Sequence, residues 1–402
     1  MNKKNKSNKG IAGKIVMGIF VAIVFISIAI AAANFGCYIT VMSRVNEYTA
    51  VENEDAVKPE KDKNGEWVFK TDRELKIVDL SDIHIGSGFL SVSKDKSAVN
   101  AIAAMITEEK PDLVVISGDS VFPVPFISGT FNNKYETNII IQLMENLGVY
   151  WAPILGNHDS EIYSLYNREA ISELYANDEL TYCLYQKGPD GVDGYGNYVI
   201  HVRNSKNELT QELIFMDSNA YTKKDPFGTK WDYDNIHSNQ ISWYRSKIEK
   251  AQAEKADVKS LVFIHIPPEE MQIALYEYWD NDNKDTKNVK YISGEINAEE
   301  PYVYCSNHSD QFFETALEMG STQAIFFAHD HRNNMVLNYK GIDLIYNYSV
   351  DYLALKGISK EKPQRGCTVI TVNTDGTYSQ QHKNYYENYY DNALYHEDTV
   401  KN

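Results

Sequence analysis

The hydrophobic pattern of the chain opens with one long apolar run near its N-terminus. Residues 15–33 form a stretch of 19 uncharged, mostly apolar residues, and uncharged residues continue to Ser43. A helix needs about 20 such residues to cross the hydrocarbon core of a bilayer. A core helix of a soluble domain is disfavoured, because polar residues do not form a face along this run. We therefore predict a transmembrane helix over residues 15–42.

Basic residues flank this run unequally, which bears on its orientation. Arg44 alone closely follows the run, and five lysines precede it: Lys3, Lys4, Lys6, Lys9 and Lys14. Because positive charge is retained on the cytoplasmic side, we expect residues 1–14 to be cytoplasmic and residues 15–42 to be an uncleaved signal anchor in the cell membrane. Everything after residue 44 is then extracytoplasmic.

Two alternatives to the anchor are less consistent with this pattern. Cleavage after Ala31–Ala33 would give a secreted protein, but the run is longer than the apolar core of about 7–15 residues in a typical signal peptide. A lipoprotein that begins at Cys37 is weaker still, because Asn34-Phe35 is a poor lead-in to a lipidated cysteine. The length of the run therefore favours the anchor.

Beyond a charged linker over residues 43–72, short apolar runs predict β-strands. Runs rich in β-branched and aromatic residues are found at 75–80, 113–116, 149–155, 261–264 and 324–328. Further strand candidates are found at 67–69, 213–216, 344–346 and 367–372.

Amphipathic stretches fill several gaps between these strands. Val99, Ile102 and Met105 have helical spacing, which predicts a helix over residues 94–110. Two more helices are expected over residues 239–255 and 310–319, after the N-cap candidates Ser238 and Ser309. The alternation predicts an α/β domain over residues 73–376, followed by a tyrosine-rich C-terminal tail over residues 377–402.

Five of the predicted strands run into polar residues that can bind metal. The blocks are Asp82-Ile83-His84, Gly118-Asp119, Gly156-Asn157-His158-Asp159, His265 and His329-Asp330-His331. Ligands of open α/β sheets gather at the carboxyl ends of the strands. A pair of divalent cations needs neutral imidazoles and carboxylate or amide oxygens from different parts of the chain. The blocks therefore predict a two-metal site.

Composition and charge narrow the class of partner. Hydrophobic residues make up 43% of the chain and charged residues 24%, as in ordinary folded proteins. The net charge is −17, and residues 1–46 hold no acidic residue, so the rest of the chain is more acidic still. An acidic body argues against nucleic acid as the main partner. It allows a phosphorylated substrate, because bound cations invert the local field.

The four cysteines match no metal-binding spacing. Cys37 lies at the edge of the apolar run, and Cys183, Cys305 and Cys367 lie in the body, where at most one internal disulfide is possible. We expect isolated, semi-buried thiols.

The order of the metal-binding blocks resembles that of the calcineurin-like metallophosphoesterase superfamily. The resemblance covers roughly residues 74–350, and it is strongest to the single-domain branch related to purple acid phosphatases, in the segments 156–161, 215–218, 265–267 and 329–333. It implies a four-layer α/β/β/α sandwich, built from two packed mixed sheets that are flanked by helices.

The resemblance also implies a role for each residue of the blocks. The first metal would be held by Asp82, His84 and His331, the second by Asn157, His265 and His329, and Asp119 would bridge the two. His158 would sit beside the metals as a catalytic residue, and Asp159 would orient it. The cofactors would be two divalent ions, with manganese, iron and zinc all compatible with the mixed nitrogen and oxygen ligands.

This ligand set predicts hydrolysis of phosphate esters. Two cations about 3.5–4 Å apart clamp a phosphoryl group and acidify a bridging water, and the resulting hydroxide attacks phosphorus in line with the leaving oxygen. The imidazole of His158 can supply a proton to that leaving oxygen near neutral pH.

Two positions depart from the family pattern. Phe122 stands where purple acid phosphatases have the tyrosine that gives their colour, so we expect a colourless site. Ala328 replaces the usual glycine of Gly-His-x-His, which would cost strain if the backbone there has a positive φ.

Other polar residues are interpreted as structural. We expect no functional role for the histidines outside the blocks: His201, His237, His308, His382 and His396. Asp79 is expected to form local hydrogen bonds, and Asp217 to lie in a turn.

The sequence thus predicts a membrane-anchored, outward-facing phosphoesterase with a binuclear metal site and a small phosphorylated substrate, either a mono- or a diester. A phosphoprotein phosphatase is one alternative, for which Arg332 is the main candidate to hold phosphate. A catalytically silent, metal-stabilised surface binding module is another, but no ligand position of the pattern is replaced.

Overall fold

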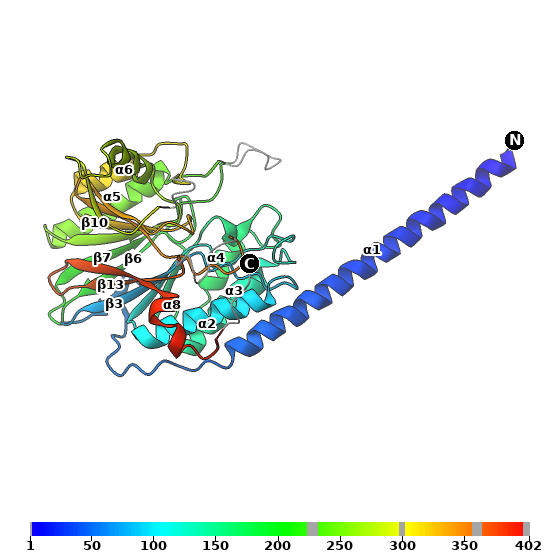
Figure 1. The fold of residues 1–402 in the computed structure, drawn as a ribbon, viewed down its shortest axis with the longest axis horizontal. Coiled ribbons are helices and arrows are strands. Elements are labelled where there is room, and N and C mark those ends of the chain that lie inside the picture. The colour runs from blue at the N-terminus through cyan, green and yellow to red at the C-terminus, as the bar shows by residue number, and fades with distance from the viewer. Residues whose placement is uncertain (1, 223–231, 297–301, 356–363, 397–402) are drawn as a thin grey trace.

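The computed structural model describes residues 2–222, 232–296, 302–355 and 364–396, and two β-sheets packed face to face lie at its centre (Figure 1). The larger sheet has nine strands in the order β1-β2-β6-β7-β8-β10-β12-β11-β9. Their bounds are β1 Glu60–Lys61, β2 Trp67–Lys70, β6 Tyr198–Arg203, β7 Leu209–Phe215, β8 Lys259–Phe263, β10 Thr322–Phe327, β12 Ile342–Tyr346, β11 Val336–Tyr339 and β9 Val289–Ser293.

The smaller sheet has five strands in the order β14-β13-β3-β4-β5. Their bounds are β14 Tyr378–Asn384, β13 Gly366–Val372, β3 Leu75–Leu80, β4 Leu113–Ser117 and β5 Trp151–Ile154. β3, β4 and β5 are parallel, so their carboxyl ends meet at one edge of the sheet.

The segment expected to be a tail begins as a strand of this sheet. β14 pairs with β13 along its full length, from Gly366 opposite Asn384 to Val372 opposite Tyr378. Its side chains are mostly polar and only partly buried, as on an edge strand with one solvated face, so the sequence carries a weak strand signal. The short helices α8 (Tyr385–Asn388) and η2 (Tyr390–Asn392) follow it.

Aromatic side chains fill the space between the two sheets. Four aromatic rings stack in a row across β6, β7, β8 and β10, and successive ring centroids are 4.6, 5.1 and 5.1 Å apart. The residues are Tyr198, Phe215, Phe263 and Phe326. Residues one position away, such as Ile214, belong to a second cluster on the opposite face. Both faces of the large sheet are therefore buried, as the period-2 alternation of strands requires.

Helices cover the outer faces, which confirms the predicted α/β/β/α sandwich. They are α2 Val92–Glu109 and α3 Asn133–Leu147 on the small sheet, α5 Ser238–Glu254, α6 Glu269–Asp280 and α7 Phe312–Met319 on the large sheet, and α4 Arg168–Tyr175 and η1 His158–Ser160 near the edge. The predicted helices α2, α5 and α7 are found within two residues of their expected bounds. Their N-caps differ from those predicted: His237, not Ser238, is the N-cap of α5, and Gln311, not Ser309, is the N-cap of α7. The Asp310 carboxylate accepts the Phe312 N–H at 2.8 Å.

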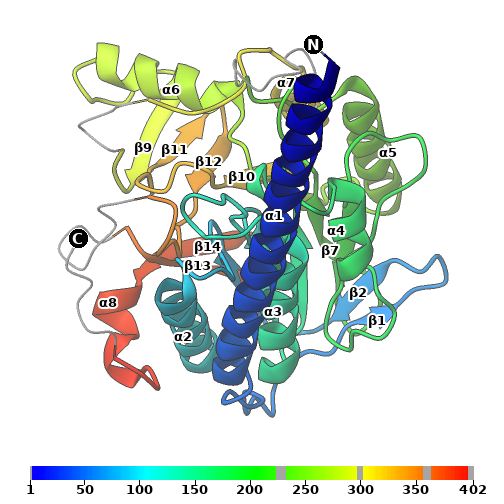
Figure 2. The same ribbon diagram turned by 90° about the vertical axis from the view of Figure 1, so that its right-hand side faces the viewer.

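One continuous helix, α1 (Asn2–Val45), contains the long apolar run (Figures 1 and 2). The part from Gly13 has a mean hydropathy of 3.0 over its most apolar window, and that window is 0% buried. The last third packs on α2 and α3, with Val41 and Val45 fully buried and Tyr38 stacked on Tyr135 at 4.6 Å. The chain therefore has one N-terminal helix that is apolar and long enough to cross a membrane, and this helix is docked on the domain.

The four cysteines are free thiols, as predicted.

Candidate metal centre

All seven predicted ligands lie at the carboxyl ends of five strands, on the loops that follow them. Three of these strands, β3, β4 and β5, belong to the small sheet, and two, β8 and β10, belong to the large sheet. In chain order, the ligands are Asp82, His84, Asp119, Asn157, His265, His329 and His331. Potential ligand atoms of Asp82, His84 and His331 lie within 4.8 Å of one another, and so do those of Asp119, His265 and His329. The structure thus brings together residues that are up to 249 positions apart in the sequence.

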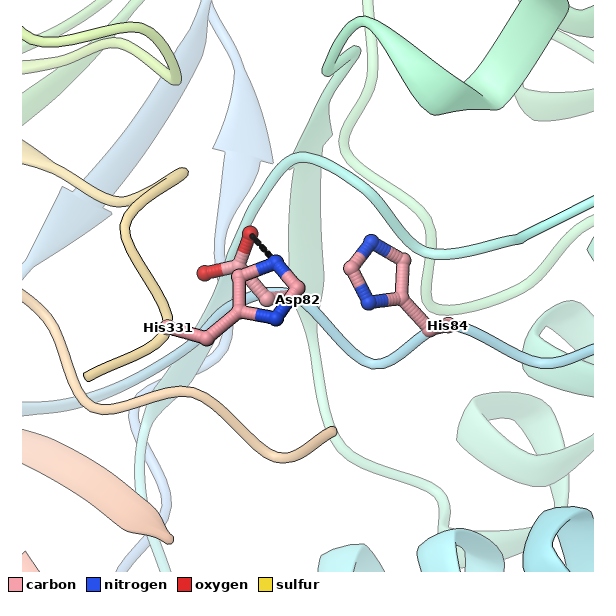
Figure 3. Close-up of side chains that lie close together, drawn as sticks. All are labelled: Asp82, His84 and His331. Carbon is pink, nitrogen blue, oxygen red and sulfur yellow. Dashed lines mark ion pairs between the residues drawn. The ribbon is translucent and has the colours of Figure 1, made fainter. Parts of the chain in front are cut away.

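Asp119 lies between the two groups. Its Oδ2 is 3.4 Å from His84 Nε2 and 3.1 Å from His265 Nε2. In the first group, His331 Nε2 is 3.6 Å from Asp82 Oδ1, and the side chains of Asp82, His84 and His331 face one another (Figure 3). The position of Asp119 is the one that a bridging carboxylate requires.

Asn157 completes the second group. Its Oδ1 lies 3.2 Å from His265 Nε2, and its Nδ2 donates to the Tyr221 hydroxyl at 2.9 Å. That hydrogen bond orients the amide so that its oxygen faces the site. His265 is oriented in the same manner, since its Nδ1 donates to the Ser117 carbonyl at 2.8 Å and leaves Nε2 for a cation.

Unpaired buried atoms show that the residues fit two cations. Asp82 Oδ1 and both ring nitrogens of His329 are buried and find no hydrogen-bond partner among the described residues. Buried polar atoms are almost always paired, because an unpaired one costs free energy. Imidazole nitrogens with carboxylate and amide oxygens suit manganese, iron or zinc, and a cation at each group would bind Asp82 Oδ1 and one ring nitrogen of His329.

The backbone is strained at four of the seven ligands. Asp82, His84, Asp119 and His329 have φ values of 46, 55, 49 and 76°, in the left-handed region that side-chain-bearing residues seldom adopt. Such strain clusters at functional sites, where the surrounding fold holds it in place. The positive φ falls on His329 and not on Ala328, so the alanine that replaces the family's usual glycine causes no strain there.

Two glycines allow the loops to approach closely. A Cβ at Gly118 would lie 2.6 Å from His265 Nδ1, and one at Gly156 would overlap Asp119 Oδ1. Neither position can hold a side chain without moving a ligand.

The carboxylates make the site strongly attractive to cations. Burial lowers the pKa of His84, but hydrogen bonds to Asp119 and Asp351 outweigh it and raise that pKa to about 10. Burial also lowers the pKa of His265, but the negative charge of Asp119 outweighs burial and raises that pKa to about 9. His329 differs, because burial and the nearby His265 hold its pKa well below the usual value. It is therefore neutral, which is the form that ligates a metal.

His158 lies beside the ligands, as predicted, but Asp159 does not orient it. His158 Nδ1 is 2.6 Å from Glu161 Oε1, and its ring packs on Phe122 at 4.8 Å. The Asp159 carboxylate instead accepts backbone N–H groups of Asp119, Ser120 and Gly156 at 3.0, 3.0 and 2.6 Å. The turn η1 explains the difference, because it places residue i+3, not i+1, beside the imidazole.

Two supporting residues were missed by the sequence interpretation. Asp351 Oδ2 is 3.0 Å from His331 Nδ1, and its Oδ1 is 3.5 Å from His84 Nδ1. Arg168 donates to the Gly156 carbonyl at 2.6 Å and pairs with Asp217, which is fully buried. Asp217 Oδ1 also accepts the Asn219 N–H at 2.9 Å, as in the turn predicted for this residue. Asp351 follows the predicted strand 344–346, which was its only signal, and Arg168 lies on the unpredicted helix α4.

A pocket of about 240 Å³ opens beside the ligands. Its walls include His158, His331, Arg332, Tyr302, Tyr304 and Leu355. Outside this region, His201 pairs with Glu212 at 2.6 Å. Asp79 accepts from Ser117 Oγ at 2.6 Å and from Asn347 Nδ2 at 2.7 Å, so its hydrogen bonds are not the local ones that the sequence predicts.

Comparisons with known proteins agree with this geometry. The model of the family described as calcineurin-like phosphoesterase matches residues 75–333, which include all seven ligands. The chain is 28% identical over 320 residues to "Probable inactive purple acid phosphatase 14" of Arabidopsis thaliana, covering 71% of this chain and 72% of that protein. It is 26% identical over 336 residues to "Probable inactive purple acid phosphatase 29" of the same plant, covering 76% and 79%.

Among solved structures, a dimetal phosphatase from Danio rerio aligns with a TM-score of 0.46 at 11% identity, over 78% of this chain and 100% of that one. The family model spans well over half of the sequence and includes every ligand position. The chain belongs to the calcineurin-like phosphoesterase family.

Proposed function

We propose that the protein is a membrane-anchored phosphoesterase that hydrolyses phosphate mono- or diesters of small substrates on the outer side of the membrane. The observation that carries the proposal is the completeness of the site. All seven ligands that the family pattern requires are present, and they converge with their donor atoms facing one another.

The division of the ligands follows from the contacts. Asp82, His84 and His331 would hold one cation, Asn157, His265 and His329 the other, and Asp119 would serve both. When bound, the two cations would neutralise charge on the phosphoryl oxygens and lower the pKa of a water. The mixed ligands allow manganese, iron or zinc.

His158 is positioned to move a proton. Its Nδ1 is engaged by Glu161, and the residue lines the pocket, so Nε2 is the ring atom available to a substrate. A leaving alkoxide benefits from a proton at this point, which imidazole supplies near neutral pH. Arg332, which also lines the pocket, can bind a phosphate oxygen.

The apolar helix supports attachment to a membrane. Its apolar window is unburied, and the lysines before it favour a cytoplasmic N-terminus. The catalytic domain would then face outward. The net charge of −17 disfavours nucleic acid as the main partner.

A catalytically silent, metal-stabilised binding module is the second candidate. The observation that favours it is the printed names of the plant relatives, each of which is called "probable inactive". The intact ligand set fits both candidates, because a metal-stabilised module also needs its ligands. The position of His158 beside them, with its Nδ1 held by Glu161, favours the enzyme.

Turnover measurements with metal-loaded protein separate the two candidates. The full chain is purified in detergent, loaded with manganese, iron or zinc, and given phosphomonoesters, phosphodiesters and pyrophosphates. The proposal predicts about two metal ions per chain by elemental analysis and turnover of at least one ester. Two metal ions without turnover of any substrate would favour the binding module.

A further inference from the structure

Large apolar side chains are exposed on three loops near the metal centre, within residues 86–91, 122–131 and 161–165. We call them the apolar loop surface, which consists of Phe89, Leu90, Phe126, Ile127, Phe131, Ile162, Tyr163 and Leu165. Phe126 is 94% exposed, Ile162 75% and Leu165 57%. A soluble domain seldom shows a contiguous apolar surface of this kind unless something covers it.

These loops are held by specific hydrogen bonds. The buried Asp95 carboxylate accepts from Gly86 N and Ser87 N at 2.8 and 2.9 Å, which fixes the loop that displays Phe89. Asn133 Nδ2 donates to the carbonyls of Asp159 and Tyr166, which fixes both ends of the loop 161–165. The apolar side chains are therefore presented by ordered backbone.

The three loops form one surface around the point where α1 leaves the domain. Leu90 N donates to Ser128 O at 3.2 Å, and Leu165 N donates to Phe131 O at 3.0 Å. Asn34, the first residue after the apolar run 15–33, donates from Nδ2 to Gly129 O at 3.1 Å. In Figure 1 the helix leaves the domain beside α3 and projects to the upper right, whereas α6 lies at the upper left of the domain, away from the point where the helix leaves it. A bilayer that holds the apolar run of α1 would thus meet these loops.

Each loop also continues a segment of the metal centre. Phe89 follows the ligand His84 by five residues, Phe126 follows Phe122, whose ring packs on His158, and Ile162 follows Glu161, which bonds His158. The pocket adds apolar area at its mouth, where Tyr302, Tyr304 and Leu355 are about two-fifths exposed. Polar ligands inside and apolar side chains around the mouth suit a phosphate group that carries a hydrocarbon part.

We propose that the substrate is a phosphoester in the head group of a lipid, presented by the same bilayer that holds α1, and that the apolar loop surface dips into this bilayer. The inference rests on the proposed phosphoesterase function. For a phosphomonoester, water would supply the oxygen that joins phosphorus and a proton for the leaving oxygen, so that the products are the lipid alcohol and inorganic phosphate. The loops would hold the mouth of the pocket at the depth of the head groups.

Contact with the bilayer is tested without catalysis. The full chain is reconstituted in vesicles with or without brominated lipids, as wild type, as Phe126→Trp and as the matched control Ile273→Trp on α6, where Ile273 is 42% exposed. Bromine quenches nearby tryptophan, so we expect added quenching for Phe126→Trp and none for Ile273→Trp. Equal quenching of the two variants would overturn the proposal. The fluorescence of Phe126→Trp could instead depend on protein density and not on bromine. This result would show that the apolar loop surface contacts a second copy of the chain, and it would also overturn the proposal.

The substrate class is tested by the ratio of two rates in the same vesicles. One substrate is phosphatidic acid in the bilayer, and the other is p-nitrophenyl phosphate in the water. We expect the wild type to hydrolyse both, and the variant Phe126→Ser with Leu165→Ser to lower the ratio of lipid to soluble turnover about fivefold. Ile273→Ser should keep the wild-type ratio.

The outcomes separate this inference from the function on which it rests. Turnover of p-nitrophenyl phosphate without turnover of phosphatidic acid would overturn the lipid substrate and leave the phosphoesterase standing. An unchanged ratio in the double variant would overturn the role of the loops. Loss of turnover on both substrates by the metal-loaded wild type would overturn the proposed function itself.

Discussion

The two sheets contribute unequally to the metal centre. The small sheet supplies Asp82, His84, Asp119 and Asn157, and the large sheet supplies three histidines, His265, His329 and His331. The ligands of the small sheet include every oxygen donor, and those of the large sheet are all nitrogen donors. The difference means that the negative charge of the ligands belongs to one sheet, and that bound cations would join this sheet to the other.

The two halves are also held in place differently. On the small sheet, one carboxylate, Asp159, binds backbone N–H groups on the loops after β4 and β5. On the large sheet, His331 is held by the side chain of Asp351, which lies on a later loop. Asp159 thus acts on backbone groups of two loops of the small sheet, whereas Asp351 acts on the side chains of two ligands, since it also faces His84. Substitutions can separate these two kinds of support.

The largest effect is expected at Asp119, the residue shared by both halves. Asp119→Asn removes the charge that faces His84 and His265, so both cations should bind weakly and turnover should fall about 10³-fold or more. Metal content and turnover are measured together, with Asp375→Asn, at an exposed turn, as control. Two tightly bound metal ions in Asp119→Asn would show that the carboxylate does not join the halves.

The next effect is expected at Asp159, where a substitution should lower the stability of the folded protein. Asp159→Asn leaves one backbone N–H group opposite an amide NH₂, because an amide has only one acceptor oxygen. We expect a loss of about 2 kcal/mol in the free energy of unfolding of the metal-free protein. Denaturant unfolding in the presence of a chelator measures it. An unchanged midpoint would place the support of this half elsewhere.

A smaller effect on stability, but a clear one on metal affinity, is expected at Asp351. Asp351→Asn weakens the orientation of His84 and His331, and removal of such partners typically lowers metal affinity about 10–100-fold. Because the backbone contacts of Asp351 are local, to Leu353, Ala354 and Leu355, the metal-free protein should lose less stability than Asp159→Asn. Metal titration and denaturant unfolding of both variants test this order, and a reversed order would contradict the comparison.

The effect that bears least on the comparison of the two sheets is a pH dependence of stability far from the metal centre. Burial lowers the pKa of His201, but Glu212 and Glu66 outweigh it and raise the pKa to about 9. A raised histidine pKa stabilises the fold fully below about pH 6.5, and this contribution is lost as the pH rises through 9. We expect a decline of about 2 kcal/mol between pH 6.5 and 9 that is absent in His201→Gln. The same decline in both proteins would show that another group titrates.

The ligands could be predicted from the sequence because each directly follows an apolar run. A strand that ends at a fixed edge places the next residues at that edge, whatever the distance between strands along the chain. Asp82, Asp119 and His265 are of this kind, and the structure places them together. The spacing of Val99, Ile102 and Met105 is likewise helical and identifies α2.

The supporting residues could not be predicted in this way. Whether Asp159 or Glu161 contacts His158 depends on the turn between them, and Asp351 and Arg168 reach the site through loop paths that have no periodicity. β14 was missed because its side chains are mostly polar and its pairing is set by the preceding hairpin. The hydrophobic pattern of the sequence thus predicts which residues follow each strand, whereas the tertiary packing determines which side chains hold those residues in place.

Anomalous X-ray diffraction from crystals of the manganese-loaded protein tests most directly whether two sheets build one binuclear site. We predict two anomalous peaks on either side of the Asp119 carboxylate, one contacted by Asp82, His84 and His331 and the other by Asn157, His265 and His329. A single peak, or peaks away from Asp119, would contradict the account.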